Sequence, residues 1–256
     1  MSKEDVKKGL IGIVVDETTI SKVMPDINSL TYRGYPVQDL CDKCKFEEVA
    51  YLVWHANLPN TLELRKFESE ERQNRRISIN LTKIIEHMPK KAHPMDVART
   101  AVSVMALEDK ETSDNSPEAN MRKAMRIFAK VPTVLGAFYR IRKGKKILKP
   151  KKDLTFSENI FYLFFGKVPQ KEIVKALDVS LILYAEHGFN VSTFTARTIT
   201  SSLSDMHGAV TGAIASLKGP LHGGANEKVM ELMNKIKTPK KAEKWINNAI
   251  NKKEVV

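Results

Sequence analysis

The sequence predicts a mainly α-helical fold with one short β-hairpin near the N-terminus. Through most of the chain, apolar residues recur at spacings of three and four, which is typical of amphipathic helices. Segment 9–23 differs, because β-branched residues alternate there around the polar stretch DETT, and this pattern favours a hairpin. The 256 residues are 42% hydrophobic and 28% charged, which suits one or two globular domains.

Capping residues and apolar stripes define the predicted helices in order. Segment 46–59 carries an apolar stripe and is expected to end before its Asn and Pro. Ser116 suits an N-cap because Pro117 follows it. Ser157 and Gly166 are expected to begin and end the next helix. The following helix should place four apolar side chains on one face: Ile173, Leu177, Leu181 and Tyr184.

Segment 204–219 predicts a helix with unusually small side chains. Gly, Ala and Ser occupy much of its surface, and small side chains let a second helix approach closely. The partner could be a helix of the same chain or one of a second subunit, and the residues leave both open.

Charge and cysteine content narrow the functional classes. The net charge of +12 attracts anions, although most of it is expected to be solvated surface charge. The basic segment 142–152 predicts a loop, either solvated or forming an anion-binding edge. Cys41 and Cys44 lack the second cysteine pair that a structural zinc would need, so we expect two thiols in a reducing compartment. No apolar run reaches the roughly 18 residues of a membrane helix, and no signal core is present, which favours a cytoplasmic protein.

Six histidines are candidates for chemistry. His55 and His87 fit structural positions, whereas the sequence does not decide between a structural and a functional role for His93 and His207. None has a metal-binding spacing, so no metal is expected. His187 falls at a polar break between two apolar helices, where backbone groups and side chains converge.

His222 is the strongest candidate and lies in the segment KGPLHGGANE. The glycines around it let the backbone approach a ligand or adopt positive φ. Asn226 is a plausible N-cap for the helix that follows. The positive end of that helix disfavours imidazolium, and a neutral imidazole can donate to a carbonyl oxygen on which negative charge develops. An enzyme that forms an enolate needs such a group.

Six ordered motifs carry a resemblance to a known family. The chain is similar to the citrate synthases of the dimeric bacterial and archaeal type and to the related 2-methylcitrate synthases. The motifs are KGLIGIVVDETTIS, LTYRGYPVQDL, FEEVAYLVWHANLP, HPMDVARTAVSV, LILYAEHGFNVSTFTAR and LKGPLHGGANE.

The resemblance implies a helical fold with a large domain, residues 1–220, and the start of a small domain, residues 221–256. It implies condensation of oxaloacetate with acetyl-CoA or propionyl-CoA, followed by hydrolysis that releases CoA. It also implies a homodimer that packs through helices including 204–219, and no metal or redox cofactor.

The same resemblance assigns three site residues. His222 corresponds to the catalytic His that hydrogen-bonds the thioester carbonyl. His187 corresponds to the His that binds oxaloacetate. Arg72 lies where relatives carry a substrate-binding Arg, and a guanidinium can grip a carboxylate with two parallel hydrogen bonds. A solvated helix charge is the alternative for Arg72.

One departure from the family qualifies these expectations. In the family, the segment after NKKEVV continues to a Gly-Phe-Gly-His motif with a second catalytic His and, beyond it, the Asp that acts as base. We therefore expect a fragment of a longer enzyme that is inactive alone. The alternative is a catalytically inactive binding or regulatory protein with this fold. Nucleic-acid and membrane partners are not expected, because no recognised nucleic-acid motif and no membrane segment is present.

Overall fold

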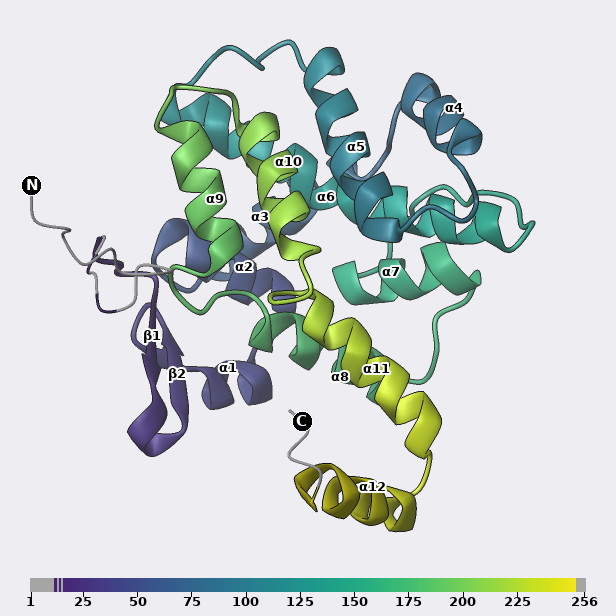
Figure 1. Cartoon of the computed structure of the whole chain (residues 1–256). Coiled ribbons are helices and arrows are strands. Elements are labelled where there is room, and N and C mark those ends of the chain that lie inside the picture. Colours follow the sequence, from purple (N-terminus) through teal and green to yellow (C-terminus); the bar gives the residue numbers. More distant parts are fainter. Residues whose placement is uncertain (1–11, 13, 15, 252–256) are drawn as a thin grey trace, which may run out of the picture. The chain divides into compact units, whose positions relative to one another are not determined.

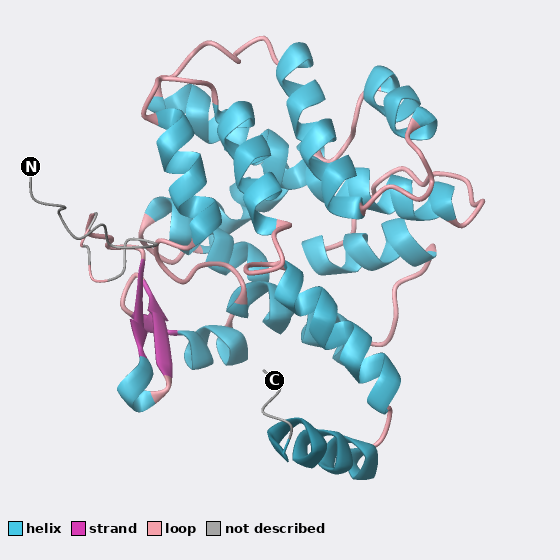
Figure 2. Ribbon diagram, in the orientation of Figure 1, coloured by secondary structure: helices cyan, strands magenta, loops and turns pink. Residues whose placement is uncertain are grey.

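The computed structural model describes residues 12, 14 and 16–251, and it is largely helical (Figures 1 and 2). The chain forms two compact units. Unit 1 combines residues up to 77 with residues 128–190, and unit 2 combines residues 78–127 with those from 191 onward. The predicted boundary at residue 220 separates a large domain from a small one and does not coincide with the division between these units. It stays a prediction.

Unit 1 begins with a three-stranded antiparallel sheet in the order β1-β2-β3. Ser21 pairs with Tyr32, and a short 3₁₀ turn joins the first two strands. The sheet elements are β1 (Ser21–Met24), β2 (Ser29–Tyr32) and β3 (Tyr35–Pro36). The helices are α1 (Val37–Lys43), α2 (Phe46–His55), α3 (Thr61–Asn74), α7 (Phe156–Phe165) and α8 (Lys171–Leu183).

The predicted hairpin at 9–23 is displaced along the chain. Residues 9–11, 13 and 15 lie outside the described residues, and of residues 16–23 only Ser21 to Val23 are in a strand. The hairpin instead turns at Pro25–Ile27, where Asn28 adopts a left-handed conformation with φ of 47°. The β-branched alternation was therefore a poor guide to where the strands lie.

Unit 2 contains six helices within its described residues. They are α4 (Ile79–His87), α5 (Pro94–Glu108), α9 (Val191–Thr200), α10 (Met206–Leu217), α11 (Gly224–Ile236) and α12 (Pro239–Asn251). The long helix α6 (Pro117–Arg142) starts in this unit and ends in the other.

Helix ends follow the predicted caps in part. Gly166 ends α7 with φ of 81°, as predicted. The N-cap of α7 is Thr155, whose side chain accepts from the Glu158 amide, so the prediction for Ser157 is wrong by two residues. Ser157 is buried in the first turn and donates to Asp178 Oδ1 at 2.8 Å. A buried hydroxyl needs a partner, and Asp178 supplies it.

The predicted apolar face of α8 is only partly correct. Ile173 and Tyr184 are exposed, whereas Ile182 is fully buried in the unit 1 core. That core joins the sheet to α1, α2, α7 and α8 through eight buried residues: Tyr32, Val37, Leu40, Phe46, Val49, Leu52, Phe156 and Ile182.

The small-sided helix α10 packs within its own unit, against α5 and α9. A Cβ added to Gly212 would lie 2.3 Å from Cδ1 of Ile199 on α9, so this glycine allows the two helices to meet closely (Figure 1). A within-chain seam therefore exists, and a subunit contact stays a prediction. Among the described residues, no helix is long and apolar enough to cross a membrane.

Candidate functional site

The His222 turn connects α10 to α11 in unit 2. The His222 amide donates to the Gly219 carbonyl at 3.0 Å, and the Gly224 amide donates to the same oxygen at 3.1 Å. The side chain of His222 is half-buried, whereas Leu221 beside it is fully exposed. As predicted, His222 comes directly before a helix N-terminus. The cap is Gly223, however, and Asn226 lies inside the helix.

The glycines of this turn allow the backbone to pass close to other main-chain atoms. A Cβ on Gly223 would lie 2.4 Å from the Leu217 carbonyl oxygen, and one on Gly224 would lie 3.0 Å from that of Gly219. Neither residue has positive φ, so that part of the expectation is wrong. The turn folds back on the end of α10, where any side chain would collide with main-chain oxygen.

Ser192, at the start of α9, fixes the imidazole of His222. Its Oγ lies 3.0 Å from Nε2 of His222. This contact uses Nε2 of His222, which leaves Nδ1 as the ring nitrogen for a ligand to meet. Sequence reasoning did not name Ser192, although the polar break that contains it was recognised.

The N-terminal end of α5 contacts both sides of the His222 turn. Lys218 Nζ lies 2.7 Å from Asp96 Oδ2, and His93 Nε2 lies 3.1 Å from Glu227 Oε2. The hydrogen bond from Lys218 holds the pKa of Asp96 below its usual range. His93, left open by the sequence, is the N-cap of α5, because its Nδ1 accepts from the Met95 amide.

His207, also left open, is a buried residue of α10. It is 1% exposed, with Nε2 3.5 Å from Asp109 Oδ2 and Nδ1 3.8 Å from Asp205 Oδ1. Burial lowers its pKa, although both carboxylates act in the opposite direction. Arg126 donates to both oxygens of Asp109, at 2.8 and 2.9 Å. This arrangement ties α10 to the end of α5 and offers no access to a substrate.

His187 lies in unit 1, in the predicted break between α8 and α9. It is exposed and precedes Gly188, whose φ is 92°. The carboxylate of Glu186 shapes this break, since Oε1 accepts from the Gly188 amide and from Ser21 Oγ. His187 and His222 thus belong to different units, and each is placed within its own.

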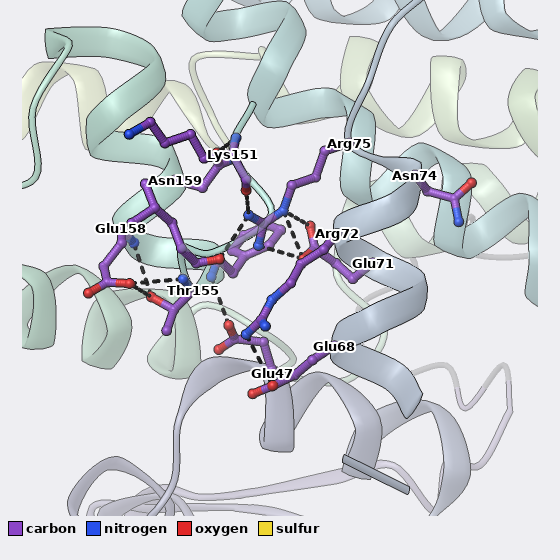
Figure 3. A network of polar contacts seen from close by, with 12 residues as sticks. Glu47, Glu68, Glu71, Arg72, Asn74, Arg75, Lys151, Thr155, Glu158 and Asn159 are labelled. Carbon is purple, nitrogen blue, oxygen red and sulfur yellow. Dashed lines mark hydrogen bonds and ion pairs between the residues drawn. The ribbon is translucent and has the colours of Figure 1, made fainter. Parts of the chain in front are cut away.

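Arg72 lies on α3 in unit 1 (Figure 3). Its side chain is 26% exposed and forms an ion pair with Glu68, one turn earlier, at 3.1 Å. Its Nε is buried without a hydrogen-bond partner among the described residues. The side chain is therefore more enclosed than a solvated helix charge, and part of its donor capacity is unused.

A fully buried neighbour of Arg72 has a structural role (Figure 3). Arg75 is 1% exposed and binds Glu71 through Nε and Nη2, at 2.6–2.9 Å. Its Nη1 donates to the carbonyls of Lys151 and Leu154, at 2.6 and 2.9 Å. This guanidinium holds the end of the basic loop against α3.

The two cysteines are free thiols in and directly after α1. Both are free and half-buried, and burial raises the pKa of each thiol. Lys175 Nζ donates to the Cys41 carbonyl at 2.7 Å. No cluster of three or more His, Cys, Asp or Glu side chains arranged for a metal occurs among the described residues.

The chain is similar to known proteins over nearly its whole length. Residues 9–256 match the family profile described as citrate synthase, C-terminal domain. A 2-methylcitrate synthase of Mycobacterium tuberculosis is 48% identical over 254 residues, which cover 99% of this chain and 64% of that protein. A citrate synthase of Mycolicibacterium smegmatis is 48% identical, with 98% and 67% covered. The chain thus spans about two thirds of the length of these relatives.

Solved structures of citrate synthases also match this chain over nearly its whole length. Citrate synthase from Thermotoga maritima matches with a TM-score of 0.85 and 35% identity, over 97% of this chain and 66% of that one. A ternary complex of carboxymethyl coenzyme A and oxaloacetate with citrate synthase from Thermoplasma acidophilum matches with a TM-score of 0.90 and 29% identity. That match covers 97% of this chain and 65% of the other.

Proposed function

The chain belongs to the citrate synthase family, and we propose that it condenses oxaloacetate with acetyl-CoA or propionyl-CoA and releases CoA by hydrolysis of the thioester. The names of its relatives support both thioesters, and the ligands named for the Thermoplasma acidophilum complex support the two classes of substrate. The observation that carries the proposal is the His222 turn, in which Ser192 holds one imidazole nitrogen and leaves the other available.

The chemistry requires such a group. The α-hydrogen of a thioester is weakly acidic, so its removal needs a base and a donor that stabilises the enolate oxygen. Nδ1 of a neutral His222 can meet the thioester carbonyl as a donor only when Ser192 donates its hydroxyl proton to Nε2, because the ring then carries its single proton on Nδ1. In the donor role, Nδ1 carries the proton and donates it in a hydrogen bond to the carbonyl oxygen.

We further propose that His187 and Arg72 bind oxaloacetate. His187 is exposed in the non-helical segment between α8 and α9 and can donate to the substrate's carbonyl or carboxylate oxygen. Arg72 retains an unused buried donor, Nε, and can exchange its contact with Glu68 for a substrate carboxylate.

The remaining proposals concern the whole protein. We propose that catalysis needs no metal or redox cofactor, that residues 1–220 and 221–256 belong to a large and a small domain that close over the substrates, and that the protein is a cytoplasmic homodimer. Exposed apolar side chains on α9 and at the end of α10 support a partner surface: Val191, Phe194 and Leu217. Light scattering should give twice the chain mass, and a monomer would contradict the dimer.

The activity is tested by following CoA release with a thiol reagent, using the full-length gene product. Replacement His222→Gln should lower kcat by roughly 10²- to 10⁴-fold, because the enolate oxygen loses its donor. His87→Gln is the matched control, since His87 only contacts a carbonyl of its own helix. Wild-type kcat in His222→Gln would exclude the proposed role.

The choice of thioester needs a separate measurement. One methylene changes binding by only about 1–3 kcal/mol, so both thioesters could be turned over. The ratio of kcat/KM for acetyl-CoA and propionyl-CoA identifies the preferred substrate. The same assay on residues 1–256 tests the expectation that this polypeptide is inactive by itself.

A further inference from the structure

We propose that His93, the N-cap of α5, and Asp96, in its first turn, are positioning residues that clamp the His222 turn from both sides. The inference rests on the proposed function only in giving His222 its chemical role. The contacts themselves are made by Lys218, at the C-cap of α10 before the turn, and by Glu227, in the first turn of α11 after it.

The contact before the turn is the better enclosed one. Lys218 Nζ lies 2.7 Å from Asp96 Oδ2, and Arg99 Nη2 lies 3.0 Å from Asp96 Oδ1. The carboxylate of Asp96 therefore holds two cations, one from its own helix and one from the start of the turn. Its position in the first turn of α5 also suits the positive end of the helix dipole.

The contact after the turn fixes a histidine tautomer. Nδ1 of His93 accepts from the Met95 amide at 3.2 Å, so this nitrogen carries no proton. The proton of a neutral His93 is then on Nε2, which donates to Glu227 Oε2 at 3.1 Å. One imidazole thus caps α5 and, with its other nitrogen, reaches α11.

Helix α5 can serve as a rigid base because it packs against α10. Lys218 at the end of α10 contacts Asp96 near the start of α5, and His207 at the start of α10 contacts Asp109 after the end of α5. The two helices are therefore antiparallel and tied at both ends. Thr211 adds a hydrogen bond to the Arg99 carbonyl at 3.5 Å between these ends.

The clamp is expected to act on position more than on overall stability. Glu227 is 61% exposed and Lys218 36% exposed, and exposed ion pairs contribute little to folding. The segment between them is short, however, and its backbone is held internally by hydrogen bonds to the Gly219 carbonyl. Loosening either side should increase local opening of the turn without unfolding the unit.

Hydrogen exchange of peptides covering residues 219–226, measured on this chain, tests the clamp directly. Lys218→Met and Glu227→Ala should each speed exchange about two- to fivefold, and the double variant by roughly tenfold. Lys218→Arg keeps the cation and should restore slow exchange. Arg122→Gln is the matched control, because it breaks an exposed ion pair with Glu111 beyond the opposite end of α5. Unchanged exchange in the double variant, at unchanged melting temperature, would overturn the clamp.

Kinetics of the full-length gene product separate positioning from folding. The double variant Lys218→Met/Glu227→Ala should lower kcat about three- to tenfold and leave KM for oxaloacetate unchanged, because His222 acts on the thioester in the transition state. Lys218→Arg should recover kcat. Faster exchange with wild-type kcat would overturn the positioning role. The His222→Gln assay decides the proposed function independently of either result.

Discussion

At the scale of single residues, polar side chains satisfy the ends of helices that lie far away in sequence. Tyr32 donates to the carbonyls of Ile182 and Leu183 at the end of α8, at 2.8 and 3.2 Å. Glu47 accepts from the first amide of α7, 109 residues away, at 2.7 Å. Helix ends leave four main-chain groups unpaired, and burial makes such groups costly unless a partner is found.

Tyr32 also predicts a dependence of stability on pH. Burial is the main cause that raises the pKa of its phenol to about 12 from 10.0. The folded state therefore holds the phenolic proton more tightly than the unfolded state. The contribution is fully present below pH 10 and is lost as the pH rises towards 12.

Tyr32→Phe should destabilise the protein by about 1–2 kcal/mol at pH 8, because two carbonyls lose their donor. The difference from wild type should shrink at pH 11, in urea unfolding measured at both pH values. Tyr35→Phe is the control, since Tyr35 is 41% exposed and should change stability by less than about 0.5 kcal/mol. An equal difference at the two pH values would contradict the account.

At the scale of elements, the contact between α9 and α10 depends on the absence of one side chain. A methyl group on Gly212 would lie 2.3 Å from the terminal carbon of Ile199. Alanine favours a helix over glycine by up to about 1 kcal/mol, while overpacking costs about 1–3 kcal/mol. At position 212, the cost of overpacking by an alanine methyl group should therefore outweigh the gain in helix propensity.

Gly212→Ala is expected to destabilise the protein by about 1 kcal/mol, and Ile199→Val should relieve that loss by removing the clashing carbon. A double-mutant cycle in urea unfolding measures the relief, which should be at least about 0.5 kcal/mol. Gly208→Ala on the same helix is the control, because its Cβ would come no nearer than 3.4 Å to another atom and should be neutral or stabilising. Additive effects would show that the seam has room to adjust.

At the scale of the whole molecule, buried charge holds unit 1 together. Arg75 joins α3 to the loop before α7, and Thr133 of α6 donates to the Arg75 carbonyl at 2.7 Å. Segments about 60 to 80 residues apart in the chain thus meet at one residue, through its guanidinium and its main-chain carbonyl. Removing one member of a buried ion pair leaves an uncompensated charge, which is costly.

Arg75→Met should destabilise unit 1 by about 3–5 kcal/mol, because Glu71 becomes a buried unpaired carboxylate. Arg75→Met combined with Glu71→Leu should recover much of this loss in thermal or urea unfolding. Arg72→Met, one turn away on α3 and 26% exposed, is the stability control and should cost about 1 kcal/mol or less. A small effect of Arg75→Met alone would argue against this role.

The sequence by itself determined the helical class, most helix segments, the helix end at Gly166, the family, and the position of the His222 turn before a helix. These features depend on short-range patterns, since helical periodicity and capping involve residues within about four positions. The cap misplaced at Ser157 is a misread local pattern, since Thr155 and Glu158 form a capping box two residues earlier. The exposed Ile173 is a case in which tertiary packing, invisible to a local pattern, decided the outcome.

Only the tertiary structure decided that Ser192 meets His222, that His93 and Asp96 reach the two sides of its turn, and that Gly223 touches main-chain oxygen. These contacts join residues from 6 to 134 positions apart. Most of them depend on how helices pack against one another, and no periodicity along the chain records that packing.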